Sequence, residues 1–428
     1  MELVLILVAV FILSSLLGLP IAFSLLMASI VGMAWEGVPF AMAVQRMFVT
    51  ADSFILLAIP FFILAGEIMT EGGLTKRLVD FSNALIGHFT AGLAQVNVLG
   101  SILFAGLSGS SAADTAAVGA VLIPAMNEQG YDKHFTIAVT CASGCIGPII
   151  PPSIFMIIYA YVANISVAAL FMAGIIPGLV VGGMQMLLCY YYGKIGKYAV
   201  GAGKRAPVST VFTTSFKAIP ALVLPVIIIG GILFGVFTPT EAGAIACVYG
   251  LIVSLLYYKD AGLRDLPRIF LTSAARTIQV MLLAAAGLVM AWLLAQKGFA
   301  SALAQAVFSI TNNPTLILII ITALLAAISC FLESLAATFI LIPALHPLAV
   351  QAGIDPLHFA MVSLITIIVG GITPPVAPIL YLACSMAGGD VTQSILRTIP
   401  FLFITYGAVL ILIFFPCLIT FIPNTFLQ

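Results

Sequence analysis

The most evident lack in this sequence is charge. Only 7% of the 428 residues are Asp, Glu, Lys or Arg, and 15 basic residues are balanced by 15 acidic ones. Nucleic-acid-binding domains concentrate basic residues on one surface, so this composition excludes that class of protein. Because 63% of the residues are hydrophobic and the mean hydropathy is +1.26, we expect a polytopic membrane protein whose solvent is the lipid bilayer.

Residues that build metal centres and disulfide frameworks are also scarce. The seven cysteines are scattered through apolar segments, and the chain has four histidines. This spacing predicts neither a cysteine-based metal site nor a disulfide framework, so we interpret the cysteines as small buried hydrophobic residues. No Lys or Arg precedes the first apolar segment, so it lacks the basic start of a cleavable signal peptide and is expected to be a retained helix.

Two proline pairs each lie in the middle of a long apolar run. They belong to the stretches 147–152 (GPIIPP) and 370–375 (GGITPP). Proline has no backbone N–H and leaves a carbonyl unpaired, so it breaks a helix. In hydrocarbon such a break is tolerated where the freed backbone is buried in protein or lines a polar cavity. Two broken membrane helices at matching places therefore point to a transport site.

Apolar runs and their polar interruptions predict the same order of elements in two halves of the chain. An amphipathic interfacial arm, a re-entrant hairpin with arms of about 13 residues, a broken helix and a closing helix recur in this order. The first half, residues 1–193, comprises helices within 3–35 and 54–69, the arm 74–88, the hairpin 91–126, the broken helix 135–163 and the helix 167–192. After a basic connector, 194–216, the second half, 217–428, comprises helices within 217–258 and 272–295, the arm 297–313, the hairpin 315–345, the broken helix 358–386 and the helix 395–416.

The two halves are expected to be copies of one unit. Pro152 and Pro177 recur as Pro375 and Pro400, with the same separation within each pair. Repeats of this length in a membrane protein usually indicate a transporter whose halves are related by two-fold symmetry.

The offset between the halves is the difference in residue number between matching positions. For the hairpins, this offset is expected to be slightly smaller than for the prolines of the broken helices. This offset pairs Pro124 with Pro343 and places Asp114 on Glu333. The difference between the two offsets is assigned to the loops that precede the broken helices.

Basic residues supply the expected orientation. If the N-terminus lies outside, most basic residues of the connectors fall on the cytoplasmic side, against Lys297 and Arg46 outside. The two hairpins then enter the membrane from opposite sides. The sequence therefore predicts two inverted-topology repeats, with both termini in the periplasm.

A hairpin tip and a helix break at the same depth in the membrane bring the ends of half-helices together. The carbonyls at their C-terminal ends can bind a cation, and the amides at their N-terminal ends can bind an anion. The oxygen ligands available there are Ser108, Ser110, Ser111, Asp114, Thr115 and the carbonyls of 143–149 in the first half, and Ser329, Glu333, Ser334, Thr338 and the carbonyls of 370–373 in the second. Hard oxygen ligands at this density suit sodium. Ser and Thr in membrane helices also commonly bond to backbone or to a neighbouring helix, so a single hydroxyl does not establish a site.

Three charged side chains lie in apolar runs, and the sequence leaves more than one role open for each. Asp114 and Glu333 are costly inside a membrane and are expected to have a function. They could carry protons, bind the cation or cap a half-helix. Arg276 could pair with a substrate carboxylate or extend to the cytoplasmic headgroups.

The hairpin stretch 107–114 (LSGSSAAD), the two proline-pair stretches and the segment 59–67 (IPFFILAGE) resemble the large membrane subunit of tripartite ATP-independent periplasmic (TRAP) transporters. The resemblance covers essentially the whole chain. It implies an all-α, elevator-type transporter, similar to the ion transporter superfamily, with two inverted repeats. It also implies sodium-driven import of an organic acid across the bacterial inner membrane. The expected partners are a periplasmic substrate-binding protein and a small four-helix (Q-type) membrane subunit.

The resemblance further implies which residues act. The static scaffold would comprise 3–35, 167–192, 217–258 and 395–416. The first sodium site would comprise Ser108, Gly109, Ser110, Ser111, Gly144, Gly147 and Pro148, and the second Glu333, Ser334, Gly370, Gly371 and Thr373. Candidate substrate contacts are Asp114, Thr115, Ser153, Arg276, Thr338, Pro151 and Pro374. Because the second tip lacks the serine run of the first, backbone carbonyls are favoured as ligands there.

Other functions stay open at this point. The substrate is expected to be a sugar acid such as sialic acid, with a C4-dicarboxylate as the alternative. A stand-alone sodium/dicarboxylate symporter of related architecture would work without a binding protein. An intramembrane protease using Ser110 or Asp114 is disfavoured, because no His or Lys lies at a matching depth to activate a serine. We therefore expect a transporter and not an enzyme.

Overall fold

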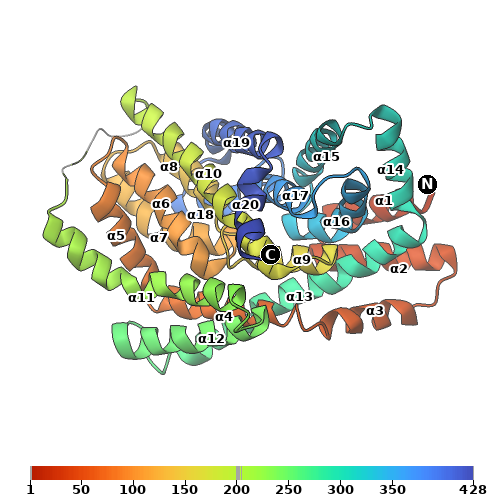
Figure 1. Ribbon diagram of the computed structural model, residues 1–428, viewed down its shortest axis with the longest axis horizontal. Helices are drawn as coiled ribbons and strands as arrows, with labels where there is room; N and C mark the ends of the chain where they lie inside the picture. The colour runs from red at the N-terminus through yellow and green to blue at the C-terminus, as the bar shows by residue number, and fades with distance from the viewer. Residues whose placement is uncertain (1, 199–202, 204, 428) are drawn as a thin grey trace.

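A computed structural model of the chain describes residues 2–198, 203 and 205–427. These residues form 20 α-helices and a short π-helical stretch, and no strand occurs among them (Figure 1). Six helices in the described ranges are long and apolar enough to cross a membrane: Val167–Lys194, Val208–Leu233, Pro239–Tyr258, Leu266–Gln296, Ser334–Gln351 and Val391–Phe414. The prediction of an all-α polytopic membrane protein is confirmed.

Within residues 2–194, which span the described first half of the chain, the structure shows ten helices. Their bounds are α1 Glu2–Leu16, α2 Ile21–Glu36, α3 Ala41–Ala51, α4 Ala58–Glu71, α5 Leu74–Ile86, α6 Gly92–Ser108, α7 Ser111–Glu128, α8 Lys133–Gly144, α9 Ile154–Ala163 and α10 Val167–Lys194. The hairpin is the pair α6 and α7, and the broken helix is the pair α8 and α9. The arms of the hairpin have 17 and 18 residues, so they are longer than expected from the apolar runs.

The second half repeats this order. Its elements are α11 Val208–Leu233, α12 Pro239–Ile252, the π-helical η1 Val253–Tyr258, α13 Leu266–Gln296, α14 Phe299–Ile310, α15 Pro314–Ser329, α16 Ser334–Gln351, α17 Pro356–Gly370, α18 Pro378–Ala387, α19 Val391–Phe414 and α20 Cys417–Phe426. Here α15 and α16 form the hairpin, and α17 and α18 form the broken helix.

Both broken helices begin with the same cap. The Asp132 side chain accepts a hydrogen bond from the Phe135 amide at 2.8 Å, and Asp355 accepts one from the His358 amide at 2.8 Å. An aspartate at this position satisfies a backbone donor that the first helical turn leaves free. The sequence therefore fixes the start of each broken helix locally.

The two broken helices run in opposite directions between the two hairpins. Helix α8 packs on α6 and α7, whereas α9, beyond the break, packs on α16 of the other hairpin. Conversely, α17 packs on α15 and α16, and α18 packs on α7. Figure 1 shows α6, α7, α8 and α18 together on the left and α9, α15, α16 and α17 on the right. This is the arrangement of two inverted repeats.

The helix bounds correct the predicted register of the hairpins. Helices α7 and α16 begin and end with the same offset that relates Pro152 to Pro375 in the broken helices. Pro124 therefore corresponds to Pro347, and the predicted pairing with Pro343 is wrong. Pro343 and Pro347 both lie inside α16, one helical turn apart, so the sequence pattern alone did not distinguish them.

In the corrected register, Asp114 and Glu333 no longer occupy equivalent positions in the two repeats. Glu333 corresponds to Ser110, and Asp114 corresponds to Ala337, so the predicted equivalence of Asp114 and Glu333 is also wrong. The same offset pairs the first residues of α7 and α16, which are both serines.

Four other elements differ from the sequence predictions. The connector predicted over 194–216 ends earlier, because α11 already begins at Val208, directly after Pro207. Helices α3 and α20 were not predicted, since each is short and follows a polar or proline-containing interruption. Helix α13 begins at Leu266, whereas the apolar run suggested a start near 272. These differences lie outside the hairpins and the broken helices.

Candidate functional site

The first break contains a local cap that closes it. The chain leaves α8 at Gly144 and re-enters a helix at Ile154. The Ser153 hydroxyl donates to the Pro148 carbonyl at 2.6 Å and accepts from the Met156 amide at 3.2 Å. Ser153 thus organises the start of α9, and its hydroxyl is already satisfied by the backbone.

The tip of the first hairpin packs directly on this break through small residues. A Cβ on Gly147 would lie 3.2 Å from the Ser110 carbonyl oxygen and 3.3 Å from a carboxylate oxygen of Asp114. Gly109 has φ +57°, and a Cβ there would lie 2.9 Å from Cα of Ser153. Only glycine allows this close approach of backbone to backbone. The structure therefore brings together the residues predicted for the first sodium site.

Around this contact lie buried oxygen atoms that have no hydrogen-bond partner among the described residues. They are Oγ of Ser108, both carboxylate oxygens of Asp114, Oγ1 of Thr115 and Oγ of Ser101 on α6. The Ser101 hydroxyl faces the Asp114 carboxylate but lies outside hydrogen-bonding geometry. Asp114 and Thr115 are fully buried. A buried polar atom without a partner costs free energy, and a desolvated carboxylate costs the most. A bound cation with oxygen ligands would remove this cost, so the residues fit sodium.

The second tip is bonded differently. Glu333 accepts hydrogen bonds from the amides of Leu335 at 3.0 Å and Ala336 at 3.1 Å, so it caps α16. The Ser334 hydroxyl donates to the Ile367 carbonyl at 3.2 Å, and Thr338 donates to the Ser334 carbonyl at 2.9 Å.

At the second break, the Thr373 hydroxyl donates to the Val369 carbonyl at 2.8 Å. Gly370 packs on Ser329, and the amide of Ile379 bonds to the carbonyl of Gly371 at 3.0 Å. One of the hydroxyls predicted at the second tip, that of Ser329, is buried and has no hydrogen-bond partner in the described chain. The second tip therefore offers fewer free side-chain oxygens than the first.

A cavity of about 520 Å³ lies between the two tips. Residues 108–113 of the first tip and 333–335 of the second line it, together with α4, α13 and the starts of α9 and α18. Asp114 and Thr115 are absent from its lining, because they are buried behind the first tip. Thr338, Ser153, Pro151 and Pro374 do not line it either.

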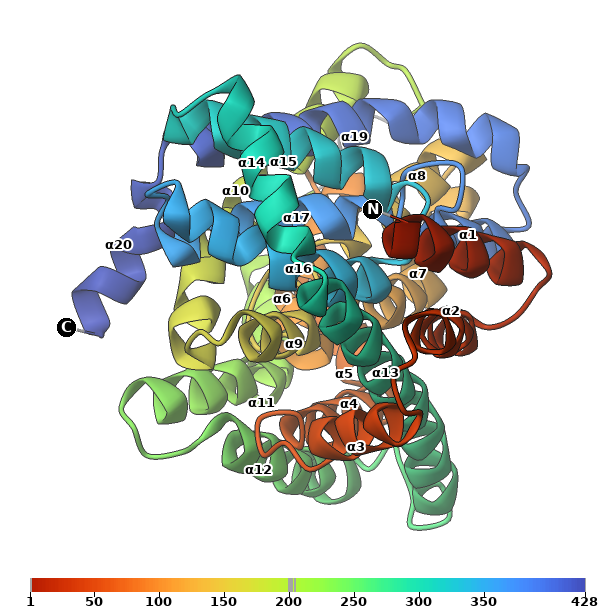
Figure 2. The same ribbon diagram turned by 90° about the vertical axis from the view of Figure 1, so that its right-hand side faces the viewer.

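Arg276 does line this cavity, on α13. Its Nη1 atom donates to Oε2 of Glu67 on α4 at 2.5 Å. Figure 2 shows α13 crossing α4 and α3, and α13 packs on both of them. Of the two roles predicted for Arg276, the position in the cavity wall fits substrate contact. Glu67 was missed in the sequence, although an acid at the end of an apolar run is a signal for function.

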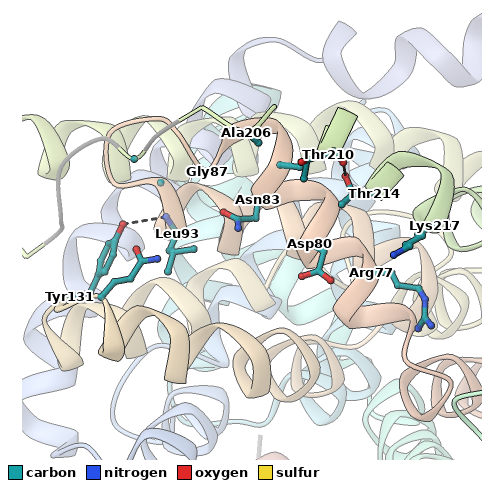
Figure 3. A pocket seen from close by; sticks show the side chains of 14 residues that line it. Arg77, Asp80, Asn83, Gly87, Leu93, Tyr131, Ala206, Thr210, Thr214 and Lys217 are labelled. Carbon is teal, nitrogen blue, oxygen red and sulfur yellow. Dashed lines mark hydrogen bonds between the residues drawn. The ribbon is translucent and has the colours of Figure 1, made fainter. Parts of the chain in front are cut away.

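A second cavity, of about 570 Å³, lies away from the tips. Figure 3 shows Asp80, Asn83, Tyr131 and Lys217 around it, with the Tyr131 hydroxyl accepting from the Leu93 amide at 3.2 Å. Its described lining comes from α5, α11 and the start of α6, together with Gln129, Tyr131, Gly203 and Ala206, and includes no residue of either tip. We therefore take the cavity between the tips as the candidate site.

Two inverted repeats, each with a hairpin whose tip meets a broken helix beside a cavity, define a secondary transporter. The family model of the tripartite ATP-independent periplasmic transporter, DctM component, matches residues 7–418. The chain belongs to this family of transporter permeases.

Three relatives support this assignment. The chain is 37% identical to the C4-dicarboxylate TRAP transporter large permease protein DctM of Pseudomonas aeruginosa, over 89% of this chain and 88% of that protein. It is 37% identical to the 2,3-diketo-L-gulonate TRAP transporter large permease protein YiaN of Escherichia coli, over 94% and 95% of the two chains. It is 36% identical to the sialic acid TRAP transporter large permease protein SiaM of Vibrio cholerae, over 96% of each.

A solved structure shares the fold. The YdaH transporter of Alcanivorax borkumensis superposes with a TM-score of 0.62 over 90% of this chain and 88% of that one. Sequence identity is 16%, so this similarity concerns the fold alone.

Proposed function

We propose that this chain carries an organic acid into the cell together with sodium, as the large membrane subunit of a TRAP transporter. The observation that supports sodium coupling is the group of buried, unpartnered oxygens at the first tip of the described chain. Sodium is a substrate of transport in this account. When bound, it would neutralise Asp114 and accept ligation from the hydroxyls of Ser108 and Thr115. The carbonyls of residues 143–149 would complete the site.

The substrate would bind in the cavity between the tips. Half-helix amides at the tips and the guanidinium of Arg276 are the groups that can hold a carboxylate there. The relatives described above are named for three different acids at nearly equal identity to this chain, so identity does not rank the substrates. Our choice is a sugar acid such as sialic acid, with a C4-dicarboxylate as the alternative.

The proposal includes the partners and the motion. A periplasmic binding protein would deliver the acid, and a small membrane subunit would accompany this chain. The hairpins and broken helices would slide as one unit against the scaffold helices within 3–35, 167–192, 217–258 and 395–416. Both termini would lie on the periplasmic side of the bacterial inner membrane.

Uptake into proteoliposomes tests the proposed function. The complex with its small subunit would be reconstituted with the binding protein outside, and labelled sialic acid or succinate would be supplied. We expect uptake that requires both an inward sodium gradient and the binding protein. Uptake of free acid without the binding protein would favour the stand-alone symporter. Uptake that is equal with potassium in place of sodium would contradict sodium coupling.

A further inference from the structure

The ion pair of Glu67 and Arg276 has an unusual distribution of exposure. Both residues line the cavity, but the side chain of Glu67 is 10% exposed, whereas that of Arg276 is 50% exposed. Within the described chain, Arg276 donates a hydrogen bond through one of its nitrogens, Nη1. A guanidinium has five donors in a fixed fork, so Arg276 retains donors for a second carboxylate. The buried partner is therefore the acid, and the accessible partner is the cation.

Arg276 is the one cationic residue among those that line the cavity in the described chain. The other charged residues of its lining are Glu67 and Glu333, and Glu333 already caps α16. An organic acid that enters this cavity thus meets a single guanidinium, which already holds a carboxylate of the protein. Two carboxylates then compete for one preferred partner.

This competition would take place beside the first tip. Gly66 precedes Glu67, and a Cβ on Gly66 would lie 3.3 Å from the Leu107 carbonyl oxygen and 3.5 Å from Cα of Ser108. The missing side chain lets α4 approach the end of α6 closely. Glu67 is therefore positioned next to the contact between α4 and the tip.

We propose that Glu67 is an internal counter-ion that holds Arg276 until the carboxylate of the substrate displaces it. The inference rests on the proposed function, because it requires an organic acid to bind between the tips. Glu67 then acts as a specificity residue: a neutral or cationic solute cannot replace it on the guanidinium. The cost of the exchange is a lower apparent affinity for the acid, by roughly tenfold, since a charge-assisted hydrogen bond must be broken.

The test is binding of labelled succinate, sialic acid and 2,3-diketo-L-gulonate to the purified membrane complex in sodium buffer. Glu67→Gln is expected to strengthen binding of the transported acid by roughly tenfold, because a neutral amide competes weakly for the guanidinium. Arg276→Gln is expected to weaken it by roughly tenfold or more, and Arg276→Lys by less, because lysine keeps the charge but not the fork.

A second ion pair on the same two helices supplies the matched control. Arg268 on α13 donates to Glu71 on α4 at 2.6 Å, one turn from Glu67. Neither residue lines the cavity. Glu71→Gln is therefore expected to leave binding of the acid unchanged.

A charge swap separates substrate competition from a purely structural clamp. The double variant Glu67→Arg with Arg276→Glu keeps a pair between α4 and α13 but buries the cation and exposes the acid. We expect it to lose binding and uptake of the acid, and restored uptake would overturn the inference. Unchanged or weaker binding in Glu67→Gln, with normal uptake by the wild type, would overturn the inference while leaving the proposed function intact. Wild-type protein that takes up none of the three acids would overturn the proposed function and this inference together.

Discussion

At the scale of single residues, Glu333 and Ser110 occupy equivalent positions but bond differently. Glu333 accepts from two backbone amides of the first turn of α16, whereas the Ser110 side chain makes no cap bond to α7. Asp114, one turn further along α7, has no partner for either oxygen in the described chain. Of the three roles open to the acids, capping is therefore observed for Glu333 and not for Asp114.

Replacing the cap is expected to affect stability. Glu333→Ala removes the acceptor for two amides and should destabilise the protein by about 1 kcal/mol, a typical value for a lost helix cap. Thermal unfolding of the purified protein in detergent would show a lower midpoint. Ser110→Ala is the matched control at the equivalent position, and its midpoint should stay unchanged. Equal losses in the two variants would contradict the assignment of the cap.

At the scale of elements, the first break depends on both prolines and the Ser153 cap. Pro151 and Pro152 supply no backbone donors, and the chain from 145 to 152 forms turns and bends in place of an α-helix. The same arrangement returns at Pro374 and Pro375 in the second half. The breaks keep the carbonyls beside the tips available for a ligand.

Replacing the two prolines of the first break with helix-forming residues should abolish transport. Pro151→Ala with Pro152→Ala returns two N–H donors and lets α8 extend toward α9, so sodium-driven uptake should be lost. Uptake into proteoliposomes is the measurement. Pro177→Ala, inside the continuous helix α10, is the control and should retain uptake. Normal uptake in the double variant would show that the break is not needed.

The broken helices could be predicted from the sequence because proline and the two aspartate caps act locally. The hairpin register could not, because Pro343 and Pro347 lie one turn apart in the same helix and both fit the pattern. The α16 cap at Glu333 decides the register, and it is visible only in the structure. Glu67 was missed for a related reason: its partner Arg276 lies far away in the chain, on another helix.

At the scale of the whole molecule, the two repeats share a fold and differ in chemistry. Thr115 and Thr338 are equivalent by the offset that relates α7 to α16, and both are buried. Thr338 donates to its own helix at 2.9 Å, whereas Thr115 has no partner among the described residues. The sequence could not show this difference, because it depends on the orientation of one hydroxyl. The first tip therefore carries the stronger case for a sodium site.

This asymmetry is tested most directly by the sodium dependence of uptake in two valine variants. Thr115→Val removes a free oxygen beside Asp114, and we expect the half-saturating sodium concentration to rise by roughly tenfold, as for a lost ligand to a charge. Thr338→Val removes a hydroxyl already bonded to backbone, so its sodium dependence should stay close to that of the wild type. An unchanged sodium dependence in Thr115→Val, or an equal rise in both variants, would contradict a sodium site at the first tip.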